Sequence, residues 1–175
     1  MLTFILCEKI VKPIYHFAFL VPTHKIEETK IWISNKIKIL EAGNKDNIVT
    51  FENWKAQSFY FYDNNKNLLE CIAREDFSDE HFKPSTAPYV ININEVGIAT
   101  DLPLSISEII IQKTKINYFA KGPVREDFAA LGTEEGLFVI SKDDRNWFPT
   151  NNLAEKHFLK VKFEVLGKDY EETLN

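Results

Sequence analysis

Cysteine is scarce in this sequence: Cys7 and Cys71 are the two among 175 residues. They form no CxxC pair, and two thiols cannot build a disulfide framework, so a disulfide-stapled secreted fold is excluded. Cys71 lies in a strand-like stretch, which predicts a buried thiol. The apolar run near the N-terminus is too short for a signal peptide or a membrane span. These absences predict a cytoplasmic protein with no membrane partner.

Clustered positive charge is also lacking. The net charge is −5, and lysines and arginines are interspersed with aspartates and glutamates. Without a basic stripe to meet phosphates, a nucleic-acid partner is not expected. The sequence also has no glycine-rich phosphate loop, no GxSxG elbow and no Cys-His nucleophile pattern. Nucleotide hydrolysis and acyl transfer by a nucleophile are therefore excluded as leading functions.

What the chain does have is aromatic, strand-like sequence with an internal repeat. Aromatic residues make up 13% of the chain, including 14 phenylalanines, which favours strands with large core side chains. At a constant offset, "YHFAFLVP" (15–22) falls on "NEVGIATD" (94–101), and "SFYFY" (58–62) falls on "LFVIS" (137–141). Each half reads as strand, helix, strand, strand, and each then ends in another strand, "NLLECIAR" (67–74) or "FLKVKFEV" (158–165).

The repeat predicts an α+β protein made of two βαβββ units. The first unit is predicted over 15–75 and the second over 90–166. Residues 1–14 are expected to form an N-terminal strand or extension. The polar, proline-containing segment 76–89 is interpreted as the linker between the units, and 167–175 as a frayed tail.

Strand alternation assigns side chains to two faces. Phe17 and Phe19 share one face of the first strand, and the apolar faces of all strands must pack on the helices. The opposite faces carry polar groups beside small residues, a combination that suits the inside of a curved sheet around a ligand cavity. This inward set comprises His16, Ala18, Glu70, Arg74, Glu95, Gly97, Ala99, Lys162 and Glu164.

Two stretches resemble the vicinal oxygen chelate superfamily, which includes glyoxalase I, extradiol dioxygenases and bleomycin-resistance proteins. "YHFAFLVP" (15–22) is similar to the histidine-bearing first strand of that superfamily. "SFYFYDNNKNLLECIAR" (58–74) is similar to its strand, turn and glutamate-bearing strand, with Asn64 and Lys66 in place of the usual proline and glycine. The second half also looks like uncharacterised glyoxalase-like proteins that carry a further N-terminal segment. On that likeness, "LTFILC" (2–7) would be the last strand of a preceding unit.

The resemblance implies a cupped mixed sheet around a cavity, with helices outside and metal ligands on the first and last strands of each unit. His16 and Glu70 match the ligand positions of the first unit. Glu95 and Glu164 are the candidates in the second, although Lys162 takes the last place after a two-residue shift. One imidazole with up to three carboxylates suits Mn, Fe, Ni or Mg better than a thiolate-preferring metal, with Zn also conceivable. Glu70 or Glu164 could also act as the proton-transfer base.

Each candidate also has a structural alternative. His16 could be a hydrogen-bonded strand histidine, Glu70 could pair with Arg74, and Glu95 could make a structural hydrogen bond. Glu164 alternates with lysines, as on any solvated strand. The expected substrate-lining residues could equally serve as packing or ion pairing: they are Tyr60, Tyr62, Arg74 and Trp147.

Three functions remain open from the sequence. The first is a metal-dependent enzyme of lyase, isomerase or dioxygenase type acting on a small oxygenated substrate. The second is a metal-free protein that binds a small molecule or antibiotic, as bleomycin-resistance proteins do. The third is a non-catalytic partner domain whose polar face is satisfied by arginine and lysine. The resemblance also implies a homodimer.

Overall fold

Among the residues that the structure describes, two β-sheets and two α-helices form the fold, and the larger sheet carries the candidate site. The computed structural model describes residues 12–43, 45–78 and 87–174. The elements in chain order are β1 (His16–Leu20), η1 (Thr23–Lys25), α1 (Ile26–Ser34), β2 (Val49–Phe51), η2 (Glu52–Trp54), β3 (Ala56–Tyr62), β4 (Leu68–Arg74), β5 (Asn92–Thr100), α2 (Pro103–Thr114), β6 (Phe128–Thr133), β7 (Gly136–Lys142), β8 (Leu159–Val165) and β9 (Lys168–Leu174). No helix within these described ranges is long and apolar enough to cross a membrane.

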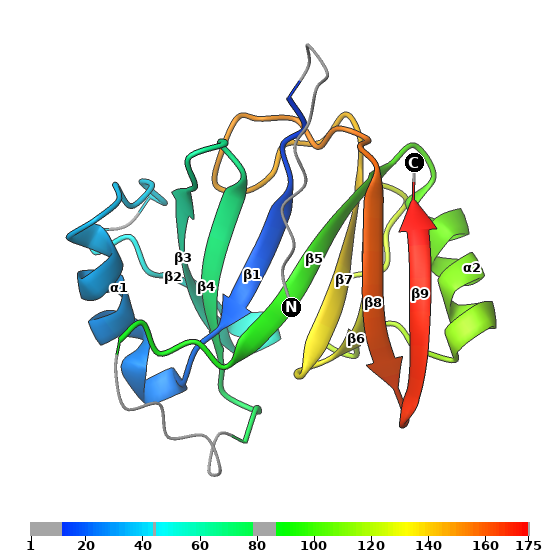
Figure 1. Cartoon of the computed structure of the whole chain (residues 1–175), viewed down its shortest axis with the longest axis horizontal. Helices are drawn as coiled ribbons and strands as arrows, with labels where there is room; N and C mark the ends of the chain where they lie inside the picture. The colour runs from blue at the N-terminus through cyan, green and yellow to red at the C-terminus, as the bar shows by residue number, and fades with distance from the viewer. Residues whose placement is uncertain (1–11, 44, 79–86, 175) are drawn as a thin grey trace.

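The larger sheet is mixed, and its seven strands follow the order β2-β3-β4-β1-β5-β7-β6. In the first half β1 runs parallel to β4, and in the second half β5 runs parallel to β7. Each parallel pair needs a crossover, which α1 and α2 supply. The two halves join where β1 and β5 pair antiparallel. The result is a curled sheet with both helices on its outside (Figure 1), which confirms the predicted α+β class and cupped sheet.

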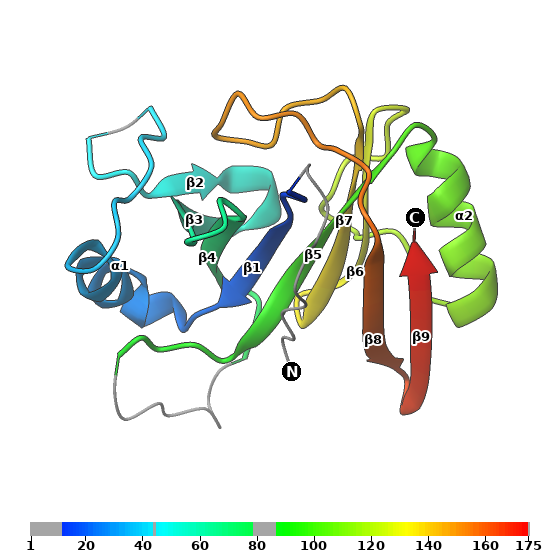
Figure 2. The same ribbon diagram turned by 45° about the horizontal axis from the view of Figure 1, so that its top comes forward.

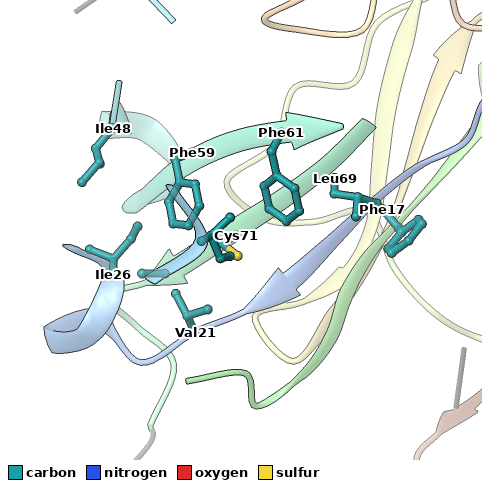
Figure 3. Close-up of a cluster of buried hydrophobic side chains, with 10 residues drawn as sticks. Phe17, Val21, Ile26, Ile48, Phe59, Phe61, Leu69 and Cys71 are labelled. Atoms are coloured by element: carbon teal, nitrogen blue, oxygen red, sulfur yellow. The ribbon is translucent and has the colours of Figure 1, made fainter. Parts of the chain in front are cut away.

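The outer face of the first half is a hydrophobic core against α1. Phe59, Phe61 and Cys71 pack there with Phe17 and Ile26 (Figure 3). Fully burying side chains of this size contributes about 1.5–3 kcal/mol each. The cluster takes every second residue of β1, β3 and β4, so the predicted alternation of faces in the first half is confirmed. The opposite face is thereby left for polar groups.

The last strand of the second half differs from the prediction. Residues 158–165 were expected to close the second unit, but β8 pairs antiparallel with β9 and lies outside the larger sheet. The hairpin packs on the outer face beside α2 (Figure 1): the rings of Phe163 and Phe138 lie 4.8 Å apart, and Lys113 Nζ lies 2.9 Å from a carboxylate oxygen of Glu172. Strand β7 therefore occupies in the second half the place of β4 in the first.

The hairpin also corrects the expected frayed tail, because residues 168–174 form the regular strand β9. Two other expectations fall largely outside the described residues. These are the strand expected within residues 1–14 and the linker over 76–89, of which residues 1–11 and 79–86 are not described.

The hairpin's docking can be tested on β8. Phe163→Ala removes the ring that contacts Phe138, and because Phe163 is half-buried we expect the free energy of unfolding to fall by about 1–3 kcal/mol. Urea unfolding followed by circular dichroism would measure it. Lys162→Ala, on the exposed face of the same strand, is the control and should change stability little. Equal stability of the two variants would contradict the docked arrangement.

Candidate metal centre

Strand register brings three of the predicted site residues together. Ala18 of β1 lies opposite Glu70 on β4 and opposite Glu95 on β5. His16 shares the face of Ala18, two residues earlier in the strand. Ala18 is fully buried, and the strand register sets its small side chain between the positions of the two carboxylates. A larger side chain at this position would occupy the centre of the site.

The three side chains converge on one another. His16 Nε2 lies 3.5 Å from Glu70 Oε2 and 4.0 Å from Glu95 Oε2. One ligand atom from each residue lies within 4.8 Å of the others. All three side chains are buried, with residue exposures of 6%, 3% and 5% in chain order. Two carboxylates removed from water at this spacing repel each other unless a proton or a cation lies between them.

The second polar atom of each residue is held by a neighbour. The backbone oxygen of Leu68 lies 3.2 Å from His16 Nδ1, and because a carbonyl only accepts, Nδ1 carries the proton. The Tyr60 hydroxyl donates to Glu70 Oε1 over 3.1 Å, and the Arg74 guanidinium donates to Glu95 Oε1. Each residue thus keeps one acceptor atom, Nε2 or Oε2, directed at the common centre.

Arg74 is the only positive side chain that contacts this centre within the described residues. It is buried at the end of β4, where its Nε donates to Asn94 Oδ1 over 2.7 Å. Its guanidinium faces the rings of Trp54 and Phe119, with 5.8 and 5.4 Å to the ring centroids. The sequence alternative that Arg74 pairs with Glu70 is therefore wrong for the direct contact, which Arg74 makes with Glu95.

Burial dominates the titration of the centre. It raises the pKa of Glu95 to about 7, with the Glu70 carboxylate raising it further and Arg74 opposing. Burial also raises the pKa of Glu70 and lowers that of His16. At neutral pH the metal-free centre therefore resists carrying two full negative charges. A bound cation would supply the missing positive charge.

Comparison with solved structures places the fold. A "putative dioxygenase" from Bacillus subtilis superposes with a TM-score of 0.51 at 13% identity, over 72% of this chain and 39% of that chain. Methylmalonyl-CoA epimerase from Mycobacterium tuberculosis gives a TM-score of 0.44 at 8% identity, over 79% of this chain and 92% of that one. The chain has the vicinal oxygen chelate fold. It spans about two fifths of the length of the Bacillus protein.

No protein-family model and no curated protein sequence matches the chain. At the identities above, the structural likeness shows the fold and nothing of the activity.

Within a vicinal oxygen chelate fold, Glu164 is not at the predicted place. Its side chain is exposed on β8, opposite Asp169 of β9, on a strand that does not belong to the cupped sheet. Lys162, its two-residue alternative, is exposed on the same strand. Neither residue contacts the centre formed by His16, Glu70 and Glu95, so both assignments are wrong. The alternation with lysines marks a solvated strand face.

The structure instead identifies the fourth position as Val139. In β5, Gly97 follows Glu95 by two residues and lies opposite Val139 of β7, just as Ala18 follows His16 and lies opposite Glu70. Sequence reasoning missed this because it matched β7 with β3. The correct match follows from the parallel pairs: β4 pairs with β1, the first strand of its half, and β7 pairs with β5, the first strand of the other half.

The predicted lining residues take different places. Tyr60 and Arg74 hold the two carboxylates, as described above. Trp147 covers His16, with 5.0 Å between the ring centroids. Tyr62 is half-buried, and its hydroxyl oxygen accepts a hydrogen bond from Asn152 Nδ2 over 2.7 Å, away from the centre. Asn94 was not singled out by the sequence, because nothing in its local pattern indicates a bond to Arg74.

Glu95 generates a pH-dependent prediction. The ordinary carboxyl pKa is 4.5, and in the folded metal-free protein that of Glu95 is about 7. As pH rises through this window the unfolded chain loses the proton first, so Glu95 progressively destabilises the fold, and the loss is complete above pH 7. Between pH 4.5 and 8 we expect the free energy of unfolding of Glu95→Gln to rise by about 3 kcal/mol relative to that of the wild type.

Urea unfolding with EDTA present, repeated across this pH range, would measure the difference. Both proteins keep His16 and Glu70, whose charges interact with that of Glu95, so the difference reports Glu95 together with its coupling to these two groups. Glu164→Gln controls for replacing a glutamate elsewhere. Parallel stability curves for Glu95→Gln and the wild type would contradict the burial of an ionisable Glu95.

Proposed function

We propose that this protein binds one divalent metal ion through His16, Glu70 and Glu95 and acts on a small oxygenated molecule. The observation that carries the proposal is the way the three ligands are held. In each of the three side chains, one polar atom is bonded to a neighbouring group and the second polar atom points to a shared centre. Such outer contacts fix ligand orientation in protein metal sites.

The donor set favours oxygen-preferring or borderline metals. One imidazole nitrogen and two carboxylate oxygens suit Mn, Fe, Ni, Zn or Mg, and no thiolate lies among them. Arg74 pairs with Glu95, and its second neighbour Glu134 is balanced by Lys121, so a divalent ion would leave the buried centre with a small net positive charge. That charge favours an anionic or oxygen-bearing substrate.

A bound divalent ion would supply Lewis-acid chemistry, polarising substrate oxygens so that a neighbouring C–H becomes more acidic. The residues of the chain would position and move the proton. Glu70 is the candidate base, because its Oε2 faces the centre while its Oε1 is bonded to Tyr60. Arg74 would hold Glu95 in place. Lyase, isomerase and dioxygenase reactions of this fold are all compatible with such an arrangement.

The metal-free antibiotic-binding alternative has less support. The pocket beside His16, which is lined by neither Glu70 nor Glu95, has a volume of about 20 Å³, enough for a water molecule. Aromatic and aliphatic side chains, including Tyr60 and Trp147, pack together in one cluster on the inner face of the sheet. A drug-sized ligand would need a far larger space. The two buried carboxylates would also lack a role in a site without a cation.

Metal content tests the proposal directly. After reconstitution with Mn, Fe, Ni, Zn and Mg in turn, the wild type should retain about one ion per chain after desalting. His16→Ala, Glu70→Gln and Glu95→Gln should each lose it, because each removes one of three ligands. Mass spectrometric metal analysis would measure the stoichiometry. Glu164→Gln is the matched control and should bind as the wild type does.

Retention of metal by all three ligand variants would place the ion elsewhere. A wild-type protein that binds none of the five metals would sink the proposal.

Tyr60 gives a finer test. Tyr60→Phe keeps the ring and removes the hydroxyl that holds Glu70 Oε1, so we expect metal affinity to fall about 10- to 100-fold. Competition against a fluorescent chelator would measure it. Tyr62→Phe, on the same strand, loses only its bond to Asn152 and should leave the affinity unchanged. Equal affinities in the two variants would show that Tyr60 does not position Glu70.

A further inference from the structure

Trp147 closes the centre from the side of the β7–β8 loop. The loop, residues 143–158 and orange in Figures 1 and 2, runs across one end of the curled sheet before returning to β8. Its Trp147 is only 6% exposed, and the indole lies 5.0 Å from the imidazole of His16 between ring centroids. Access to His16 from this side is therefore blocked by one side chain.

The indole lies beside Gly97 and Val139, where the second half of the sheet provides no side chain that could bind a metal. A Cβ on Gly97 would come within 3.0 Å of Trp147 Cη2 and of the His16 backbone oxygen, so the ring lies directly on the bare backbone of β5. Gly97 pairs with Val139, the position matching Glu70 in the other half. Trp147, Val139 and Ala130 belong to one hydrophobic cluster. The quadrant opposite Glu70 is thus apolar and filled by the indole.

Besides Trp147, the loop is held by the fully buried Ala154 of the same cluster and by the Phe148 ring, which contacts the rings of Phe51 and Tyr60. Over residues 142–153 every side chain other than Trp147 is half-buried or exposed, including Phe148 at 48% exposure. Partly exposed groups add further contacts, among them Asn152 with Tyr62, Lys156 Nζ with Asp101 at 2.7 Å, and Arg145 over the Phe128 ring. Segments with few buried apolar contacts open at low free energy. Within residues 142–153, the indole is therefore the one buried side chain that has to withdraw for this part of the loop to open.

We propose that Trp147 holds the place of the substrate, and that the substrate binds on Gly97 and Val139 after the loop withdraws the indole. The shape of this place selects a flat, largely apolar molecule about the size of an indole. Resting on the proposed metal function, the molecule carries an oxygen atom at the end nearest His16. Trp147 is then the residue that decides which ligands enter.

Chemical modification of His16 tests the cover without any metal. In EDTA-treated protein, diethyl pyrocarbonate should modify His16 slowly and the exposed His24 quickly, with peptide mass spectrometry following both. Trp147→Gly should raise the His16 rate about tenfold or more, because the imidazole is no longer covered. Leu153→Ala, an exposed residue of the same loop, is the matched control and should leave the rate unchanged.

Chemical rescue separates an emptied site from a misfolded protein. Added indole should slow His16 modification in Trp147→Gly and raise its melting temperature, whereas it should not affect the wild type. Trp147→Phe, with a smaller ring, should give an intermediate rate and serves if the glycine variant does not fold. An unchanged His16 rate in both variants, or no rescue of a folded Trp147→Gly, would overturn the proposal.

The oxygen-donor part has its own readout. Phenol and toluene have similar flat rings, and phenol alone offers an oxygen atom. In Trp147→Gly, Co²⁺ should tighten the binding of phenol and leave that of toluene unchanged, measured by thermal shift and by the visible absorption of Co²⁺. Equal effects on the two probes would overturn the oxygen contact. If Co²⁺ does not bind at all, the proposed metal function fails, while the His16 and indole results still decide the role of Trp147.

Discussion

The antiparallel pairing of β1 with β5 is the constraint on which the candidate centre depends. It joins the two halves of the sheet, and in the same register it sets Ala18 against Glu95. The parallel pairing of β1 with β4 sets Ala18 against Glu70 from the other side. A slip of one residue in either pairing would turn one carboxylate to the opposite face, towards a hydrophobic cluster. Fold and site are therefore specified by the same backbone hydrogen bonds.

This shared register explains why the polar centre is tolerated in a buried place. Isolated carboxylates inside a sheet would destabilise the fold by several kcal/mol. Here Tyr60 lies on β3 opposite Glu70, and Arg74 lies on β4, the strand that carries Glu70. The bonds of Tyr60 to Glu70 and of Arg74 to Glu95 therefore form when the sheet forms. These bonds fix the direction of each carboxylate and leave its Oε2 directed at the common centre. The remaining electrostatic deficit is what makes the centre suited to a cation.

Local pattern predicted as much of the site as depends on alternation within one strand. His16, Glu70 and Glu95 were assigned to the inner face because a strand repeats every two residues, and the structure agrees. Glu164 satisfied the same rule but lies on a strand of a different sheet. Alternation reveals which face a residue takes and not which strand lies next to it. That choice rests on the contact of Phe163 with Phe138, which is non-local, and on the hairpin pairing of β8 with β9, a strand whose sequence was expected to form a frayed tail.

The two halves of the sheet repeat one backbone plan yet contribute unequally to the centre. The first half provides His16 and Glu70, and the second provides Glu95 and the apolar Val139. A third carboxylate, at the fourth position Val139, would add negative charge to a buried site whose two carboxylates one arginine only half neutralises. With valine at this position, the side of the centre opposite Glu70 is apolar, and a ring can lie on it. Valine at position 139 thus limits the buried charge and leaves room for a ligand. The indole of Trp147 shows that a flat ring fits there.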